Sequence, residues 1–316
     1  MGNSCFTGAS PKLPGKTHDP AFKWKIYGFS ALIERGATSA NSASFHCGGF
    51  NWFLQVIPMH KKSGGEVPYV ALVLGLSRIG FKIGHVMDAV FELSMYNHSN
   101  GTHYGYRASY SFGTKNTHSE QISLMPLEEL LKSSDFLVDD GCIFGVRILK
   151  ADISSTKKNH VRISKKPTTV QNLFLQKKGV IKGTYTWTFD FNSLDLKLPV
   201  HSPAFEVGGH KWIITMHPDG DEYSTNSLSL SLHLCDVNEL PDVESGVMIE
   251  LTLSILDQKY GQHYSRAGRL VFANLGWGWS DFISLTKFKD TSRGYLVEST
   301  CVLKADISII GSSNDD

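Results

Sequence analysis

One stretch of sequence occurs twice, as Phe205-Glu206-Val207-Gly208-Gly209-His210-Lys211-Trp212 and as Phe45-His46-Cys47-Gly48-Gly49-Phe50-Asn51-Trp52. Both copies follow the pattern F-x-x-G-G-x-x-W. A Gly-Gly pair between two apolar segments predicts a tight turn, because glycine adopts positive φ without a Cβ clash. After each Trp the apolar residues alternate as far as a proline, Pro58 or Pro218, which is typical of a half-buried strand and its end. The repeated unit is therefore a β-hairpin anchored by a tryptophan.

Further repeats extend the similarity over both halves of the chain. Lys304-Ala305-Asp306-Ile307-Ser308 is identical to Lys150-Ala151-Asp152-Ile153-Ser154, and Gly261-Gln262-His263-Tyr264 resembles Gly101-Thr102-His103-Tyr104. Repeats at nearly constant spacing indicate a duplicated domain. Many short alternating strands with turn signals between them predict an all-β fold, with two antiparallel β-sandwich domains in tandem. Each domain is expected to hold at most a short helix, such as the one predicted at Pro126–Leu131.

The division of the chain follows from these repeats. We expect a flexible tail over residues 1–20, sandwich domains over 21–155 and 184–312, a basic linker over 156–183 and a short tail over 313–316. A basic linker is usually solvated, and it can also contact an anionic membrane surface. Each half has its own opening strand, hairpin and closing strand, so we expect each half to fold by itself.

Composition narrows the class of protein. The chain has 316 residues, 41% of them hydrophobic, and a net charge of +1, which is a globular balance without a bias toward nucleic acid. The five cysteines are scattered and none forms C-x-x-C, so neither a disulfide framework nor a zinc site is expected. This cysteine usage fits a reducing compartment, and we expect a cytoplasmic protein. No apolar run is long enough to span a membrane.

The first residues, Met1-Gly2-Asn3-Ser4-Cys5, allow a second interpretation. Gly2 is a candidate for myristoylation and Cys5 for palmitoylation, although Phe6 stands where the general pattern has Ser or Thr. Acylation at these two residues would bring the protein to the plasma membrane as a peripheral protein. The other interpretation is a plain disordered tail.

The chain resembles the MATH (meprin and TRAF-C homology) domain over residues 22–154 and again over 184–310. In the second half the resemblance rests on Trp187, the hairpin ending at Trp212, His217-Pro218-Asp219-Gly220, Gly276-Trp277-Gly278-Trp279-Ser280-Asp281-Phe282 and Gly294-Tyr295-Leu296. The first half keeps Trp24, the hairpin and the strand around Phe91, but has no W-G segment. The chain is similar to plant proteins built of tandem MATH domains. The resemblance implies an antiparallel sandwich that holds short linear peptides of partner proteins, often in adaptors of the ubiquitin pathway.

No pattern of an enzyme is found. The sequence has no G-x-S-x-G, P-loop or H-E-x-x-H in a fitting context. Cys47 and Cys142 lie in predicted strands, where cysteine is usually a small buried hydrophobe. His103 and His263 recur at equivalent positions, but the spacing shows no further metal ligands. We therefore expect no enzyme, no cofactor and no metal site.

The resemblance also suggests where a peptide would bind. In adaptor MATH domains a groove lined by aromatic residues crosses one sheet, and by position Tyr69 and Phe91 match two of these residues in the first half. Trp277 and Trp279 match two others in the second half. Neither half has the whole set, because Ser227 and Leu251 replace the first two aromatics in the second half. Trp277 can equally pack in the core of a glycine-rich turn.

Two classes of function remain open. The first is an adaptor that binds peptide segments of partner proteins, or other MATH domains. The second is a carbohydrate- or ligand-binding sandwich of lectin type, in which Trp277 and Trp279 would stack on a sugar. The repeated MATH pattern favours the first class.

Overall fold

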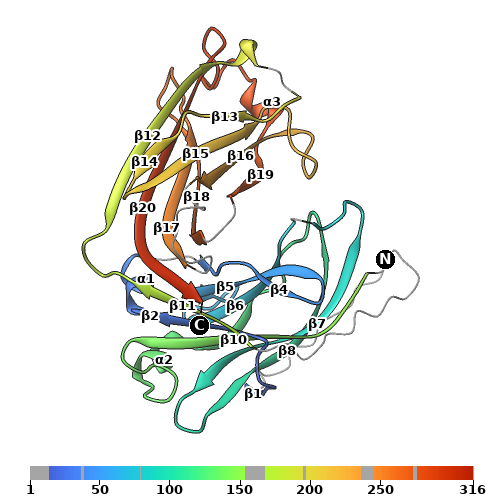
Figure 1. Ribbon diagram of the computed structural model, residues 1–316, viewed down its shortest axis with the longest axis vertical. Coiled ribbons are helices and arrows are strands. Elements are labelled where there is room, and N and C mark those ends of the chain that lie inside the picture. The colour runs from blue at the N-terminus through green and yellow to red at the C-terminus, as the bar shows by residue number, and fades with distance from the viewer. Residues whose placement is uncertain are drawn as a thin grey trace.

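The computed structural model describes residues 14–36, 39–78, 80–153, 168–194, 197–235, 245–272 and 276–315. It contains two β-sandwiches, and Figure 1 shows the second lying above the first. The helices in the described residues are short: α1 (Ser30–Glu34), α2 (Leu127–Lys132), the 3-10 helix η1 (Phe191–Ser193) and α3 (Leu285–Phe288). The prediction of an all-β fold with two sandwich domains in tandem is confirmed.

The first sandwich is made of two antiparallel layers. One layer has the order β1 (Gly15–Lys16), β8 (Thr102–Gly113), β7 (Val86–Asn97), β10 (Gly141–Ile153), β2 (Phe22–Tyr27). In the other layer β3 (Ala40–Asn41) and β4 (Phe45–Cys47) both pair with β5 (Phe50–Lys61), which is followed by β6 (Pro68–Leu76) and β9 (Ile122–Pro126).

The second sandwich repeats this plan. One layer has the order β12 (Ile181–Asp190), β20 (Thr300–Asp315), β17 (Ser245–Ile255), β18 (Tyr264–Phe272). In the facing layer β13 (Val200–His201) and β14 (Phe205–Val207) pair with β15 (His210–His217), which is followed by β16 (Ser227–Leu234) and β19 (Trp277–Ser284).

The repeated hairpin has the same geometry in both domains. All four glycines of the two turns have positive φ, between 61° and 81°. The indole Nε1 of Trp52 donates a hydrogen bond to the carbonyl of Cys47 (3.0 Å), and Trp212 does the same to Val207 (3.2 Å). Both tryptophans are fully buried. The hairpin turn therefore places a large side chain in each core, and its carbonyl accepts a hydrogen bond from the one polar atom of that side chain.

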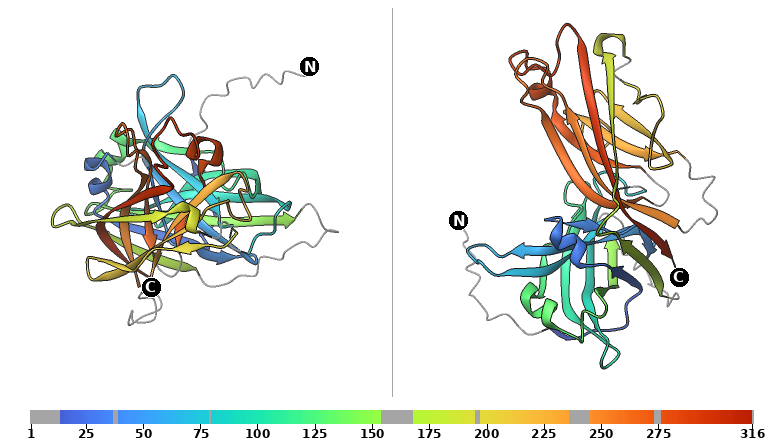
Figure 2. Two further views of the ribbon diagram at one scale, coloured as in Figure 1. Left: turned by 90° about the horizontal axis from the view of Figure 1, so that it is seen from above. Right: turned by 90° about the vertical axis from the view of Figure 1, so that its left-hand side faces the viewer.

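A strand that the sequence analysis did not predict lies within the range expected as a linker. Strand β11 (Thr169–Leu175) pairs in parallel with β2 and antiparallel with β20. In the right-hand view of Figure 2, β20 runs down the second sandwich and ends beside β11. The Nδ2 of Asn172 donates to the Oδ1 of Asn314 (3.0 Å), which adds a side-chain bond to this ladder. The layers of the two domains are thus joined into one hydrogen-bonded sheet.

The core of the first sandwich contains residues from outside it. Leu173 of β11 and Met248, Val271 and Ile310 of the second domain belong to the same buried cluster as Trp24. Within the part of the chain that the structure describes, the core of the second sandwich is built from second-half residues alone. The expectation that the first half completes its own core is therefore wrong.

Polar contacts also join the two domains. Tyr223 donates from its hydroxyl to the carbonyl of Arg78 (2.9 Å). Glu250 of β17 lies between Arg269 of β18 (2.6 Å to Nε) and Arg35 (4.0 Å to Nη1). These contacts hold the second sandwich against one end of the first.

Candidate functional site

Strand β19 is an edge strand of the second domain. Within the described part of the chain it pairs with β16 on one side, and no strand pairs with it on the other. An edge strand presents unpaired N–H and C=O groups to which a further strand can add. The backbone at β19 is therefore open to an extended peptide.

Two aromatic side chains lie at this edge. Trp277 and Trp279 are two positions apart, with Gly278 between them, so both point to the same side of β19. Both are half-buried against the second core. Their ring centroids are 4.5 Å apart at an interplanar angle of 71°. Trp277 lies on Gly268 of β18, where an added Cβ would come within 2.5 Å of the indole. The pair therefore packs between β18 and β19, and we call this contact region the seam.

Arg266 completes the seam, and the sequence analysis missed it. Its guanidinium carbon lies 5.2 Å from the centre of the Trp279 ring, and its Nη1 donates to the Oδ1 of Asp281 (3.0 Å). Arg266 and Gly268 are two residues apart on β18, so they share one side of that strand. The signal that could have found them is this Arg-x-Gly spacing on a strand that precedes the tryptophan segment.

The expectation that Phe91 faces solvent is wrong. Its side chain is fully buried and its ring packs against Phe112 with centroids 6.2 Å apart. Leu251, at the equivalent position of the second domain, is also fully buried. Phe91 therefore offers no surface for a ligand, and the change from Phe to Leu between the domains is a change within the core.

Tyr69 lies on β6 in the first domain and is half-buried. The Nζ of Lys62 stands 4.2 Å from the centre of its ring, a cation–π contact. Because Tyr69 and the tryptophan pair belong to different sandwiches, the structure does not bring the four predicted residues into one site.

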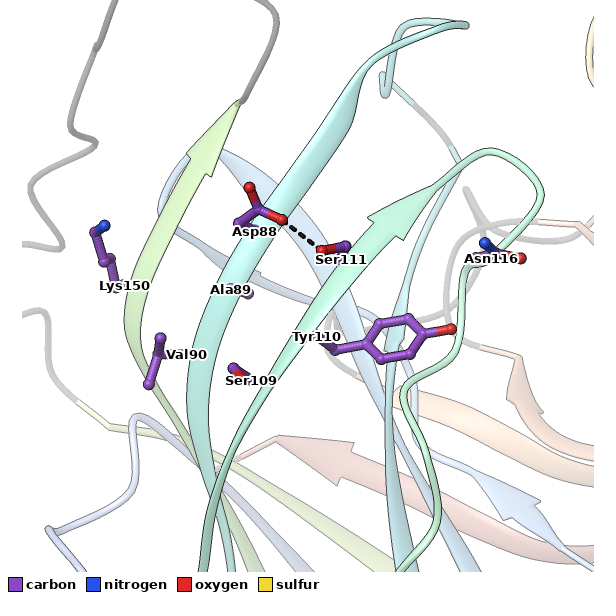
Figure 3. Close-up of a pocket in the computed structure, with 8 residues that line it drawn as sticks. All are labelled: Asp88, Ala89, Val90, Ser109, Tyr110, Ser111, Asn116 and Lys150. Atoms are coloured by element: carbon purple, nitrogen blue, oxygen red, sulfur yellow. Dashed lines mark hydrogen bonds between the residues drawn. The ribbon is translucent and has the colours of Figure 1, made fainter. Parts of the chain in front are cut away.

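An open depression of about 570 Å³ lies elsewhere, on β7, β8 and β10 of the first domain. Figure 3 shows Asp88 directed at Ser111, with which it is hydrogen-bonded, and Lys150 on the neighbouring strand. Lys150 forms an ion pair with Asp152 (2.6 Å). Asp88, Ser111 and Lys150 thus already have partners within the chain, so the depression is a weaker candidate than the β19 edge.

Two buried cysteines and the two recurrent histidines have defined surroundings. Burial raises the pKa of the Cys142 thiol far above its usual range, and it raises the pKa of Cys301 to about 12. Burial, assisted by Lys23, lowers the pKa of His103 to about 4. His263 accepts a hydrogen bond at Nδ1 from the backbone N–H of Asp257 (3.1 Å). Since the thiolate is the nucleophilic form of cysteine, neither buried thiol is activated.

Within the described ranges, no group of three His, Cys, Asp or Glu side chains is placed to hold a metal ion. In the same ranges no helix has the length and apolar character needed to cross a bilayer. The acylation candidates Gly2 and Cys5 lie outside the described residues.

Several known proteins are similar to parts of this chain. A TNF receptor-associated factor homolog (1a) of Arabidopsis thaliana is 31% identical over 43% of this chain, and the match covers 13% of that protein. Ubiquitin C-terminal hydrolase 12 of the same plant is 29% identical over 45% of this chain and 12% of its own length. The chain thus corresponds to about an eighth of these relatives. Among solved structures, Notothenia coriiceps TRAF5 matches 41% of this chain and 74% of its own, with 22% identity and a TM-score of 0.34.

A family model settles the assignment. The model of the MATH domain matches residues 21–148 and 184–307, the same two stretches that form the sandwiches. MATH domains are a domain type that mediates protein binding. This chain therefore belongs to the MATH domain family and carries two MATH domains in tandem.

Proposed function

We propose that this protein is an adaptor that holds extended peptide segments of partner proteins along the edge strand β19, and that it acts by binding rather than by catalysis. The observation that carries the proposal is the half-buried Trp277–Trp279 pair at an unpaired strand edge. An added strand gains main-chain hydrogen bonds from the edge, and pockets beside it read alternate side chains.

The surroundings of the pair support an anchoring role. Trp277 is fixed by its contact with Gly268, and Trp279 by Arg266 and by Phe282, whose ring centre is 5.7 Å away. A rigid aromatic pair loses little conformational entropy on binding, which favours its use as an anchor.

Replacing Trp279 by alanine should weaken peptide binding by about tenfold or more, since truncating an aromatic anchor can cost about 2 kcal/mol. A partner is first isolated by pull-down with the full chain, and its binding segment is then titrated against the wild type and Trp279→Ala. Circular dichroism and thermal unfolding confirm that the variant is folded.

The matched control is Ile122→Ala on β9, the edge strand of the first domain. Ile122 pairs with Leu72, as Trp279 pairs with Leu230 at the corresponding place in the second domain. The control should bind the peptide as the wild type does. Unchanged affinity in folded Trp279→Ala would remove the β19 edge from the proposal. Binding in a glycan array without any peptide partner would replace the adaptor by a lectin-type function.

Partners are best sought in assemblies of the ubiquitin pathway and of TRAF-like signalling. Two relatives are named ubiquitin C-terminal hydrolases, and two are named TNF receptor-associated factor homologs. Because the two tryptophans already fill part of the seam, we expect one domain to bind a peptide with micromolar or weaker affinity. Multivalent contacts would raise the overall affinity in the cell.

We also propose that the protein is located in the cytoplasm. If Gly2 and Cys5 are acylated, each contributes one of the two signals that stable membrane attachment requires. Gly2→Ala and Cys5→Ser should then each move the protein from the membrane fraction to the supernatant. An unacylated N-terminus in the intact mass of the protein from its native cell would exclude this part of the proposal.

A further inference from the structure

Three histidines and a group of hydroxyls share the outer face of one layer of the second domain. On β15 the side chains of Trp212, Ile214 and Met216 enter the core, so Thr215 and His217 point to the opposite side. In the register of the sheet, His201 of β13 stands beside Thr215, and Thr215 stands beside Ser231 of β16. We call this surface the imidazole face: His201, Thr215, His217, Ser231 and His233.

Hydrogen bonds tie the imidazole face together. The Nδ1 of His201 lies 3.0 Å from the Oγ1 of Thr215. The Nε2 of His233 lies 2.9 Å from the Oγ of Ser231. His201 is exposed, whereas His217 and His233 are half-buried. A ligand can therefore reach imidazoles that already have a fixed orientation.

The duplicated domain shows that the sheet does not require these residues. The first sandwich has the same strands in the same register, and its outer face carries different side chains. The equivalent pairs, first domain against second, are Asn41 and His201, Gln55 and Thr215, Ile57 and His217, Val73 and Ser231, and Gly75 and His233. In the first domain, Ile57 and Val73 form a small buried apolar cluster with Ala71. One fold thus carries Ile57 and Val73 in one copy where the other copy carries His217 and Ser231, which points to a ligand and not to packing.

The imidazole face borders the β19 edge across two glycines. Ser231 pairs with Gly278, and the ring of His233 lies over Gly276, where an added Cβ would come within 2.1 Å of it. Neither Gly278 of β19 nor Gly276, the residue before this strand, has a side chain. A side chain of a strand added to β19 can therefore extend over these glycines to His233 and Ser231. The alternate side chains of the same strand would point to the Trp277–Trp279 seam.

The titratable groups around the imidazole face indicate which side chain of a peptide it can bind. Burial, together with the nearby imidazoles of His201 and His217, lowers the pKa of His233. The charged residues on the strands around them are Glu206 of β14, which pairs in register with Lys211 of β15, and Asp281 of β19, which bonds to Arg266. Asp221, in the turn after β15, accepts backbone N–H groups of Tyr223 and Ser224. An anion on the imidazole face would relieve the repulsion among protonated rings.

We propose that the imidazole face binds an anionic side chain, a carboxylate or a phosphate, of a peptide seated on β19, and that this binding strengthens as the histidines take up protons. The inference rests on the proposed function and adds the ligand class and its regulation. Histidines exchange their protons near neutral pH, and protonated rings donate charge-assisted hydrogen bonds. Because the pKa of His233 is lowered, affinity for the anionic peptide should rise as the pH falls from about 7.5 to about 5.

The test uses the full chain and an array of short extended peptides, each synthesised in three versions that carry Gln, Glu or phosphoserine at one position. Binding is measured at about pH 5 and about pH 7.5, below and above the usual histidine pKa. The variant His201→Asn/His217→Gln/His233→Gln keeps polar side chains but cannot take up protons. His60→Gln, which changes an imidazole on β5 of the first domain, is the matched control.

The wild type and the control should bind Glu or phosphoserine versions about tenfold or more tightly than Gln versions at the lower pH, an advantage that shrinks at the higher pH. The triple variant should lose this preference and keep its affinity for Gln versions. Comparing the affinities of the Glu and phosphoserine versions shows whether a carboxylate or a phosphate is preferred. Equal binding of all versions by the wild type would overturn the inference and leave the proposed function standing, and so would a preference that persists in the triple variant. If no version binds at either pH, the proposed function fails and the inference fails with it.

Discussion

A fragment of residues 20–155 should not fold cooperatively, whereas a fragment of residues 182–312 should. Four buried side chains of the first core, Leu173, Met248, Val271 and Ile310, are absent from the first fragment. Burying one large apolar side chain is worth about 1.5 to 3 kcal/mol, so their loss removes roughly 6 to 12 kcal/mol. A domain of this size is stable by only about 5 to 15 kcal/mol. The fragment of residues 20–155 should therefore be unfolded or molten.

The loss of β11 adds to this effect. Strand β2 pairs with β11 over six residues, and without β11 it becomes an exposed edge. Among the described residues, the second core contains none from the first half, so the fragment of residues 182–312 keeps every residue of that core. Calorimetry and amide dispersion in NMR spectra of both fragments and of the full chain measure the difference. A sharp, cooperative transition of the first fragment alone would show that the residues contributed by the second domain are dispensable.

The hairpins could be predicted because their determinants are local. The turn needs two glycines with positive φ, and the Trp five residues after Cys47 or Val207 bonds back to that carbonyl. Strand β11 could not be predicted in this way. Its partners β2 and β20 are more than 130 residues away on either side, and its segment contains Gln171 and Asn172, which read as loop residues. This segment forms a strand only because the tertiary structure places β2 and β20 beside it as hydrogen-bonding partners.

The misplacement of Phe91 has a different cause. The sequence itself puts Phe91 on the same side of its strand as Ala89 and Leu93, an apolar set typical of a buried face. The resemblance to the MATH family assigned Phe91 to a groove, whereas the alternation of apolar residues along its strand correctly indicates a buried side chain. For Trp277 and Trp279 the sequence correctly identified a distinctive segment. It could not show that both rings meet Gly268 and Arg266 of β18, because that contact depends on how two sheet edges approach each other.

Replacing Trp212 by alanine should cost about 3 to 5 kcal/mol, the usual loss for a large buried aromatic side chain. The ring is fully buried, packs edge-on against Phe272 at 5.3 Å, and bonds to the Val207 carbonyl. Trp52→Ala should cost a similar amount in the first domain, where Phe112 takes the place of Phe272 at 5.2 Å. Trp212→Phe and Trp52→Phe keep most of the packing and lose the indole hydrogen bond, so each should cost about 1 kcal/mol beyond the small change in volume.

The two alanine variants should nevertheless unfold different parts of the chain. Trp212→Ala weakens the second sandwich, which supplies Met248, Val271 and Ile310 to the first core, so both halves should lose protection together. Trp52→Ala weakens only the first sandwich, because the second core needs nothing from it. Limited proteolysis with mass spectrometry distinguishes these outcomes. Trp52→Ala should leave a resistant fragment near residues 182–315, and Trp212→Ala should leave none. A resistant first half in the Trp212→Ala digest would mean that the first core closes without the second domain.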